Sequence, residues 1–89
     1  MKSWTWKPEK NETLKKMGRP SFEDIVDSLD AGGFRDVLGN PNYPDQYLLV
    51  VMVDGYIHVV PFKINQEIFF LFTAYPSRTL QKRYGGNKK

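Results

Sequence analysis

The sequence predicts a single α+β domain over residues 1–86, in which two helices pack on one face of an antiparallel sheet. Three observations lead to this prediction. The length of 89 residues suits one domain. Apolar residues recur with helical spacing before Gly33, and after it they follow strand patterns separated by turn-forming residues. Helices followed by a run of strands are typical of two-layer α+β folds. Residues 87–89 are expected to form a disordered tail.

The first half of the chain divides into a short strand and two helices. Residues 4–6 are expected to be extended. A helix over residues 8–17 follows, because proline is favoured at a first helical position, and Gly18 ends it. Ser21 suits the N-cap of a second helix, which the Gly32-Gly33 pair ends. Each helix has apolar residues for the core: Leu14 and Met17 in the first, and Phe22, Ile25, Val26 and Leu29 in the second.

The second half reads as a four-stranded meander and a short terminal helix. The expected strands span residues 34–38, 47–53, 56–63 and 68–75. Asp54-Gly55 suits a two-residue hairpin turn, and Asn65-Gln66 turns the chain again. Ser77 is expected to cap a helix over residues 78–84, which Gly85-Gly86 would end. The order is β-α-α-β-β-β-β with a C-terminal helix. If the first two helices cover one sheet face, the other face stays partly open for function.

Composition excludes several classes of site. The chain has no cysteine and one histidine, so disulfides, thiol catalysis and a His/Cys metal cluster cannot form. We therefore expect neither a metal nor a cofactor. The longest apolar run, residues 47–53, is far shorter than the roughly 20 residues of a membrane span. The N-terminal segment lacks the apolar stretch of a signal peptide, so a cytoplasmic protein without a membrane partner is expected.

Charge is segregated along the chain. Residues 1–20 hold six basic and two acidic side chains, whereas residues 21–36 hold one basic and five acidic ones. From Pro76 onward there are five cations and no acid. Two basic ends around an acidic middle suggest two faces for two kinds of partner. The alternative is that these are ordinary solvated helix faces and tails.

Four groups of residues resemble the motifs of the BrnT-like toxins, in the same order along the chain. They are Trp6, Lys10-Asn11, Leu14 and Ser21-Phe22-Glu23-Asp24; Asn40-Pro41-Asn42 with Tyr43-Pro44 and Gln46; Val60-Pro61-Phe62; and Pro76-Ser77-Arg78. Two departures stand out. Gly18-Arg19-Pro20 displaces the family's glycine, and Thr79 replaces a lysine that usually follows the terminal arginine.

The resemblance implies the RelE superfamily of bacterial toxin–antitoxin modules. Its toxins are messenger-RNA endonucleases, acting with or without the ribosome, and each is neutralised by a cognate antitoxin that is typically a small DNA-binding protein. Such cleavage needs no metal, because the RNA 2′-OH itself attacks the phosphate. The enzyme orients the phosphate, neutralises developing charge and transfers protons. The number of copies in the assembly is left open.

Arg78 is the main catalytic candidate that the resemblance indicates. It matches the family's arginine, and its planar fork suits bidentate contact with phosphate. Lys82 lies one turn further on the same helix face, and such like charges cost a few tenths of a kcal/mol unless an anion binds between them. Arg83 adds to the same field. Each of these has the alternative of a solvated surface cation.

Other candidates have weaker signals and open alternatives. His58 has the side-chain chemistry for general acid–base catalysis, but a single histidine in a strand is more often structural. Tyr84 either donates a proton or packs its helix on the sheet together with Leu80. Lys63 either contacts RNA phosphate or is an exposed edge lysine. Three aromatic residues are suited to stacking on bases, although the two tryptophans fit the core better: Trp4, Trp6 and Tyr75.

Three functional classes are compatible with these residues. A toxin-type endoribonuclease is preferred. A noncatalytic RNA- or ribosome-binding module would need the same cations and aromatic rings without a proton-transfer pair. A structural partner in a repressor complex would need neither.

Overall fold

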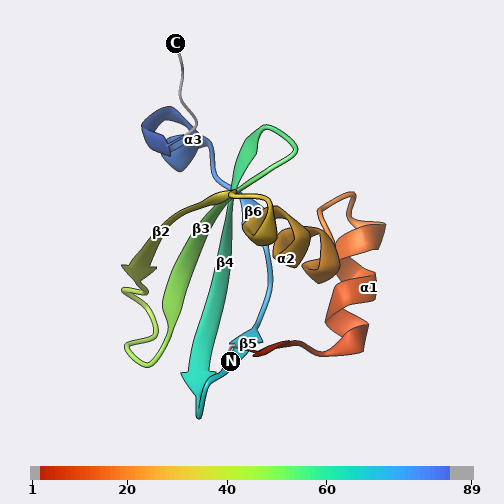
Figure 1. Cartoon of the computed structure of the whole chain (residues 1–89), viewed down its shortest axis with the longest axis vertical. Helices are drawn as coiled ribbons and strands as arrows, with labels where there is room; N and C mark the ends of the chain where they lie inside the picture. Colours follow the sequence, from red (N-terminus) through yellow and green to blue (C-terminus); the bar gives the residue numbers. More distant parts are fainter. Residues whose placement is uncertain (1–2, 85–89) are drawn as a thin grey trace.

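The computed structural model describes residues 3–84, so the expected tail at 87–89 and the Gly85-Gly86 helix stop lie outside the described residues. Nine elements follow in order: β1 (Ser3–Thr5), α1 (Pro8–Lys16), α2 (Phe22–Asp30), β2 (Phe34–Gly39), β3 (Tyr47–Val53), β4 (Tyr56–Asn65), β5 (Ile68–Leu71), β6 (Tyr75–Pro76) and α3 (Arg78–Tyr84). Figure 1 shows α1 and α2 together on one side of the sheet and α3 at its upper end. The expected α+β class is confirmed.

The sheet order is β1-β5-β4-β3-β2, with β6 pairing β4. Strands β2 to β5 form the expected antiparallel meander, and β1 adds to β5 in parallel. The turn between β3 and β4 has positive φ angles at Asp54 and Gly55, as predicted. The next turn lies at Gln66-Glu67, one residue later than expected, because β4 continues to Asn65.

The last expected strand is divided in two, which corrects the prediction of one strand over residues 68–75. β5 ends at Leu71 and β6 begins at Tyr75, although both pair with the same side of β4. The interruption lies opposite Pro61, whose carbonyl accepts a hydrogen bond from the Phe72 N–H at 2.9 Å. Proline has no N–H to return the second ladder bond, so pairing stops there.

The main core lies between the two long helices and one face of the sheet. It contains two buried residues of α2 and three of β3, joined by buried residues of α1, β4 and β5: Phe22, Ile25, Leu49, Val51, Val53, Leu14, Val60, Phe62 and Leu71. Trp4 and Trp6 pack against this core, as their core interpretation predicted.

Three residues expected in the core lie differently. Val26 is only partly buried and does not belong to the core cluster. Met17 follows the end of α1 and is 53% exposed, so it does not extend the stripe begun by Leu14. Leu29 is only partly buried at the core margin. The N-cap of α2 forms as predicted: the Ser21 hydroxyl accepts from the Asp24 N–H, and the Asp24 carboxylate accepts from the Ser21 N–H. Within residues 3–84, no helix is long and apolar enough to cross a bilayer.

Candidate functional site

Helix α3 covers the sheet face that the two long helices leave free. The Ser77 hydroxyl accepts a hydrogen bond from the Leu80 N–H and so caps the helix as expected. Gln81 reaches the sheet, where its side-chain oxygen accepts from the Ile57 N–H at 2.7 Å. Beneath α3, β3 and β4 contribute the fully buried Val50 and Ile57. The open face that the sequence suggested is therefore partly closed by the chain's own C-terminal helix.

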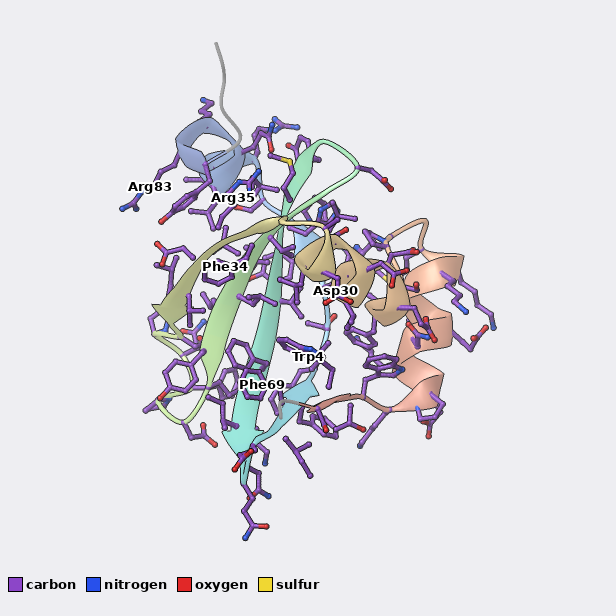
Figure 2. The ribbon with its side chains drawn as sticks, in the orientation of Figure 1. Trp4, Asp30, Phe34, Arg35, Phe69 and Arg83 are labelled. Carbon is purple, nitrogen blue, oxygen red and sulfur yellow. The ribbon has the colours of Figure 1, made fainter. Side chains whose placement is uncertain are left out.

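The exposed side of α3 carries the predicted cations. Arg78, Lys82 and Arg83 are all exposed, whereas Leu80 and Tyr84 lie on the partly buried side. Within residues 3–84, none of the three cations takes part in a salt bridge. The Arg83 guanidinium lies 5.3 Å from the centre of the Tyr84 ring, and Figure 2 shows its end directed away from the molecule. These charges are available to an anion in solution.

Tyr84 anchors α3 to the sheet. Its hydroxyl donates a 2.7 Å hydrogen bond to Asp36 on β2. This bond raises the pKa of Tyr84 and lowers the pKa of the Asp36 carboxyl. A tyrosine with a raised pKa is a poor general base, and a phenol already bonded to a carboxylate must break that bond before it donates elsewhere. The contact fits the packing role that was one of its two interpretations.

His58 lies on the sheet face opposite α3, with its ring between the helices and the hairpin. It is 7% exposed, and Nδ1 lies 3.0 Å from the Tyr56 carbonyl oxygen. Because a carbonyl can only accept, Nδ1 carries the proton in the neutral ring and Nε2 is free to accept one. Burial lowers the pKa of His58 from 6.5, against the opposing effects of the Tyr56 carbonyl and Asp54. The imidazole is therefore neutral at pH 7.

A cleft of about 320 Å³ opens beside this ring. The turn at residues 18–20 forms one wall, and the hairpin residues Asp54 and Tyr56 form the other. Arg19 projects from that turn, and its guanidinium donates to the Ala74 carbonyl at 3.3 Å. Its charge contributes to the lowered pKa of His58. Asp24 and Asp54 add negative charge to the rim, so an anion entering the cleft is favoured on the Arg19 side.

The sequence reasoning missed Arg19 as a site residue. Its turn drew attention only as a departure from the motif of the toxin family. One feature of the sequence could have indicated Arg19. An arginine between Gly18 and Pro20 lies in a turn of restricted conformation and not on a solvated helix face. What brings it to His58 is the packing of that turn against β4 and the segment before β6, which local sequence does not specify.

β6 connects the histidine cleft with α3. Pro76 pairs with His58, and the Ser77 N–H donates to the Ile57 carbonyl at 3.1 Å. Paired Cα atoms in antiparallel strands are about 5 Å apart, and two further residues add at most about 7 Å. The Cα of Arg78 therefore lies within about 12 Å of the Cα of His58.

The remaining predicted residues divide between two places. Tyr75 pairs with Val59 beside α3 and is exposed, so it lies at the same end of the sheet as Arg78, Lys82 and Arg83. We call Tyr75 and these three cations the Arg78 group. Lys63 is exposed on β4, six residues from Ile57, or about 20 Å along the strand. It therefore does not join the α3 cations. The structure brings Arg78, Lys82, Arg83, Tyr84 and Tyr75 to one end of the sheet, and His58 lies at the same end on the opposite face.

Comparison of the chain with models of protein families gives no match, and neither the curated proteins nor the solved structures contain one. The geometry of the His58 cleft and of α3, together with the motifs that resemble the BrnT-like toxins, is therefore what the functional conclusion rests on.

Proposed function

We propose that this protein is the toxin of a bacterial toxin–antitoxin module, a metal-independent endoribonuclease that acts in the cytoplasm. One observation carries the proposal: the strand segment that holds the single histidine pairs with β6, which ends two residues before Arg78, the first residue of α3. His58, whose imidazole is neutral, and the exposed Arg78 thus have their Cα atoms within about 12 Å of each other. These are the two kinds of group that cleavage by a neighbouring 2′-OH requires.

In the proposed reaction, His58 Nε2 accepts the proton of the 2′-OH as that oxygen bonds to phosphorus. The bond from phosphorus to the 5′-oxygen then breaks, and the 5′-oxygen takes a proton from water. The products are a 2′,3′-cyclic phosphate and a free 5′-hydroxyl. Arg78 stabilises the charge on the non-bridging oxygens, and Lys82 and Arg19 add to the positive field. Tyr84 holds α3 in place through Asp36.

The test is incubation of the purified protein with a defined RNA in the presence of chelator, followed by analysis of the new ends. We expect 2′,3′-cyclic phosphate ends from the native protein. Arg78→Ala should abolish cleavage, and Arg78→Lys should restore it only in part, because a point charge lacks the bidentate fork. The matched control is Lys16→Ala, which removes an exposed cation at the far end of α1. Full cleavage by a folded Arg78→Ala variant would contradict the assignment.

His58 has a variant that separates its chemistry from its packing. His58→Asn keeps an N–H close to the position of Nδ1, so the hydrogen bond to the Tyr56 carbonyl can persist, but the acceptor at Nε2 is lost. We expect cleavage to fall by about 10²–10⁴-fold, the usual range for general acid–base catalysis. A native-like unfolding curve with unchanged cleavage would remove His58 from the reaction.

The proposed partner is a small DNA-binding antitoxin. An acidic segment of it would cover Arg78, Lys82 and Arg83 and so block access of phosphate, while its other half binds the operator. Charge complementarity makes such association fast and salt-sensitive. Lys82→Glu with Arg83→Glu should therefore slow binding several-fold at low salt. Asp27→Lys, on the exposed side of α2, should not. If only the Asp27 change weakens the complex, the antitoxin docks on α2 instead.

A noncatalytic RNA- or ribosome-binding module is the second candidate. The observation that favours it is the burial of His58, because a ring that is 7% exposed must be reached through the cleft. RNA binding by the native protein with no new ends after prolonged incubation would select this alternative.

A further inference from the structure

A second cationic surface lies at the other end of the sheet. A cavity of about 240 Å³ opens between the start of α1 and the end of β5. Lys7 and Lys10 line it on the helix side, and Phe70 and Phe72 line it on the sheet side. We call these residues, together with Lys63, the phenylalanine–lysine surface. The Arg78 group does not include any of them.

The two phenylalanines form a fixed aromatic pair. Their ring centres are 5.1 Å apart, with an angle of 56° between the ring planes. Both side chains are only partly buried, and both residues line the cavity. The N–H of Phe72 is bonded to the carbonyl of Pro61, so the backbone of Phe72 is anchored where β5 ends.

Lysines surround this pair on two sides. Lys63 is the cross-strand partner of Phe70, and directly paired residues of antiparallel strands have side chains on the same face. Lys7 and Lys10 approach from the start of α1. Within the described part of the chain, none of the three lysines has a salt-bridge partner. Their charges are therefore not neutralised by the protein itself.

We propose that the phenylalanine–lysine surface binds a single-stranded segment of RNA, with a base against Phe70 and Phe72 and flanking phosphates on the three lysines. Aromatic rings bordered by cations are how proteins hold single strands without reading sequence, because every base has a ring face to stack. An acidic peptide would match the lysines, but the side chains of Asp and Glu have no aromatic ring to stack on the phenylalanines. That the bound single strand is RNA rests on the proposed function.

The position of the surface gives it a role distinct from catalysis. Lys63 is five residues from His58 on β4, or about 17 Å along the strand, and it faces the other side of the sheet. The surface therefore holds nucleotides that flank the cleaved bond. It should add affinity for longer RNA and leave cleavage of the shortest substrates unchanged.

The test separates binding from cleavage by using a 2′-O-methyl RNA of roughly 12 nucleotides, which lacks the attacking hydroxyl and lies within the span of single-strand sites. Its affinity is measured by fluorescence anisotropy between about 50 and about 300 mM salt. The triple variant Lys7→Gln, Lys10→Gln, Lys63→Gln should bind at least about tenfold more weakly at low salt. Its salt slope should fall by about 2, since each lost phosphate contact contributes about 0.7 for single strands.

A matched control removes the same charge elsewhere. Lys15→Gln, Lys16→Gln and Arg35→Gln are changes at exposed positions away from the cavity, and they lower net charge equally. Equal loss of affinity in both triple variants, or no loss in the first, would overturn the inference. Phe70→Leu with Phe72→Leu keeps apolar volume but removes the ring faces, so affinity should fall several-fold with an unchanged salt slope. An unchanged affinity in this folded variant would also overturn it.

The outcomes distinguish this inference from the proposed function. If the native protein binds the methylated strand through this surface but cleaves no RNA, the surface stands and the endoribonuclease proposal fails. If the native protein cleaves RNA and the lysine variant binds and cleaves long RNA as the native protein does, the endoribonuclease proposal stands and this inference fails.

Discussion

Asn11 offers the sharpest test of how the two long helices are joined. It is 4% exposed on α1, yet both ends of its amide are bonded to the start of α2. Its Oδ1 accepts from the Phe22 N–H at 2.8 Å, and its Nδ2 donates to the Glu23 carboxylate at 2.8 Å. The N–H groups of a helix's first turn have no partner within the helix. Asn11 therefore supplies from α1 a partner for the Phe22 N–H, in addition to the cap that Ser21 gives to the Asp24 N–H.

We expect Asn11→Ala to lower the free energy of unfolding by about 1.5–4 kcal/mol. A buried N–H left without a partner costs about 1–3 kcal/mol, and the lost hydrogen bond to the exposed Glu23 adds about 0.5–1 kcal/mol. The assay is urea unfolding at pH 7, followed by the fluorescence of Trp4 and Trp6, both packed against the core. The slope with urea should not change, because the same surface is exposed on unfolding.

Two further variants test the reasoning. Asn11→Asp keeps the acceptor for Phe22 but brings a second carboxylate against Glu23, and Glu23→Gln should then restore part of the lost stability. The hydrogen bond from Asn11 is the main cause of the lowered pKa of Glu23, so Asn11→Ala should return that pKa toward 4.5 in an NMR titration. Thr13→Ala, on the exposed side of α1, should cost less than about 0.5 kcal/mol. A cost below about 1 kcal/mol for Asn11→Ala would refute the capping role.

Three other outcomes are expected. Leu14→Ala should cost about 2–5 kcal/mol in urea unfolding, and Leu29→Ala clearly less, because Leu14 is fully buried and Leu29 only partly. Gly33→Ala should destabilise strongly, since its Cβ would meet two backbone oxygens at 2.6 and 2.8 Å, whereas Gly39→Ala faces open space; equal unfolding midpoints would contradict this. Because burial lowers the native pKa of His58, the unfolded chain binds more protons below pH 6.5. Stability should therefore fall as pH drops from 6.5 toward that lowered pKa, and His58→Asn should reduce the fall in urea midpoint.

Much of the fold could be predicted because its signals are local. A proline start, the Ser21 cap and the apolar spacing of Phe22 and Ile25 specify helices within a few residues of themselves. Asp54-Gly55 likewise specifies its hairpin, because the φ angles that the turn needs are ones these residues adopt readily. Leu29 is less buried than its place in the apolar stripe of α2 predicted. The burial of a residue at the end of such a stripe depends on how far the sheet extends beneath the helix.

The candidate site was predicted less completely. The cations of residues 78–84 and the helix that carries them could be predicted, because i, i+4 spacing determines which side chains share a helix face. The place of His58 was not predictable in the same way. Its strand was clear, but its neighbours are a turn from residues 18–20 and a two-residue strand from the far end of the chain. Lys63 was expected either to contact RNA phosphate or to be an exposed edge lysine, and only the strand register placed it opposite Phe70.

The sequence by itself determined the elements, their order and the segregation of charge, because each depends on spacing within one segment. Only the tertiary structure decided which elements meet. It paired β1 in parallel with β5, broke the last strand at Pro61, and placed Arg19 beside His58. The physical reason is that backbone pairing and burial join residues far apart in the chain. The charge or ring of a side chain does not by itself specify which distant residue it will contact.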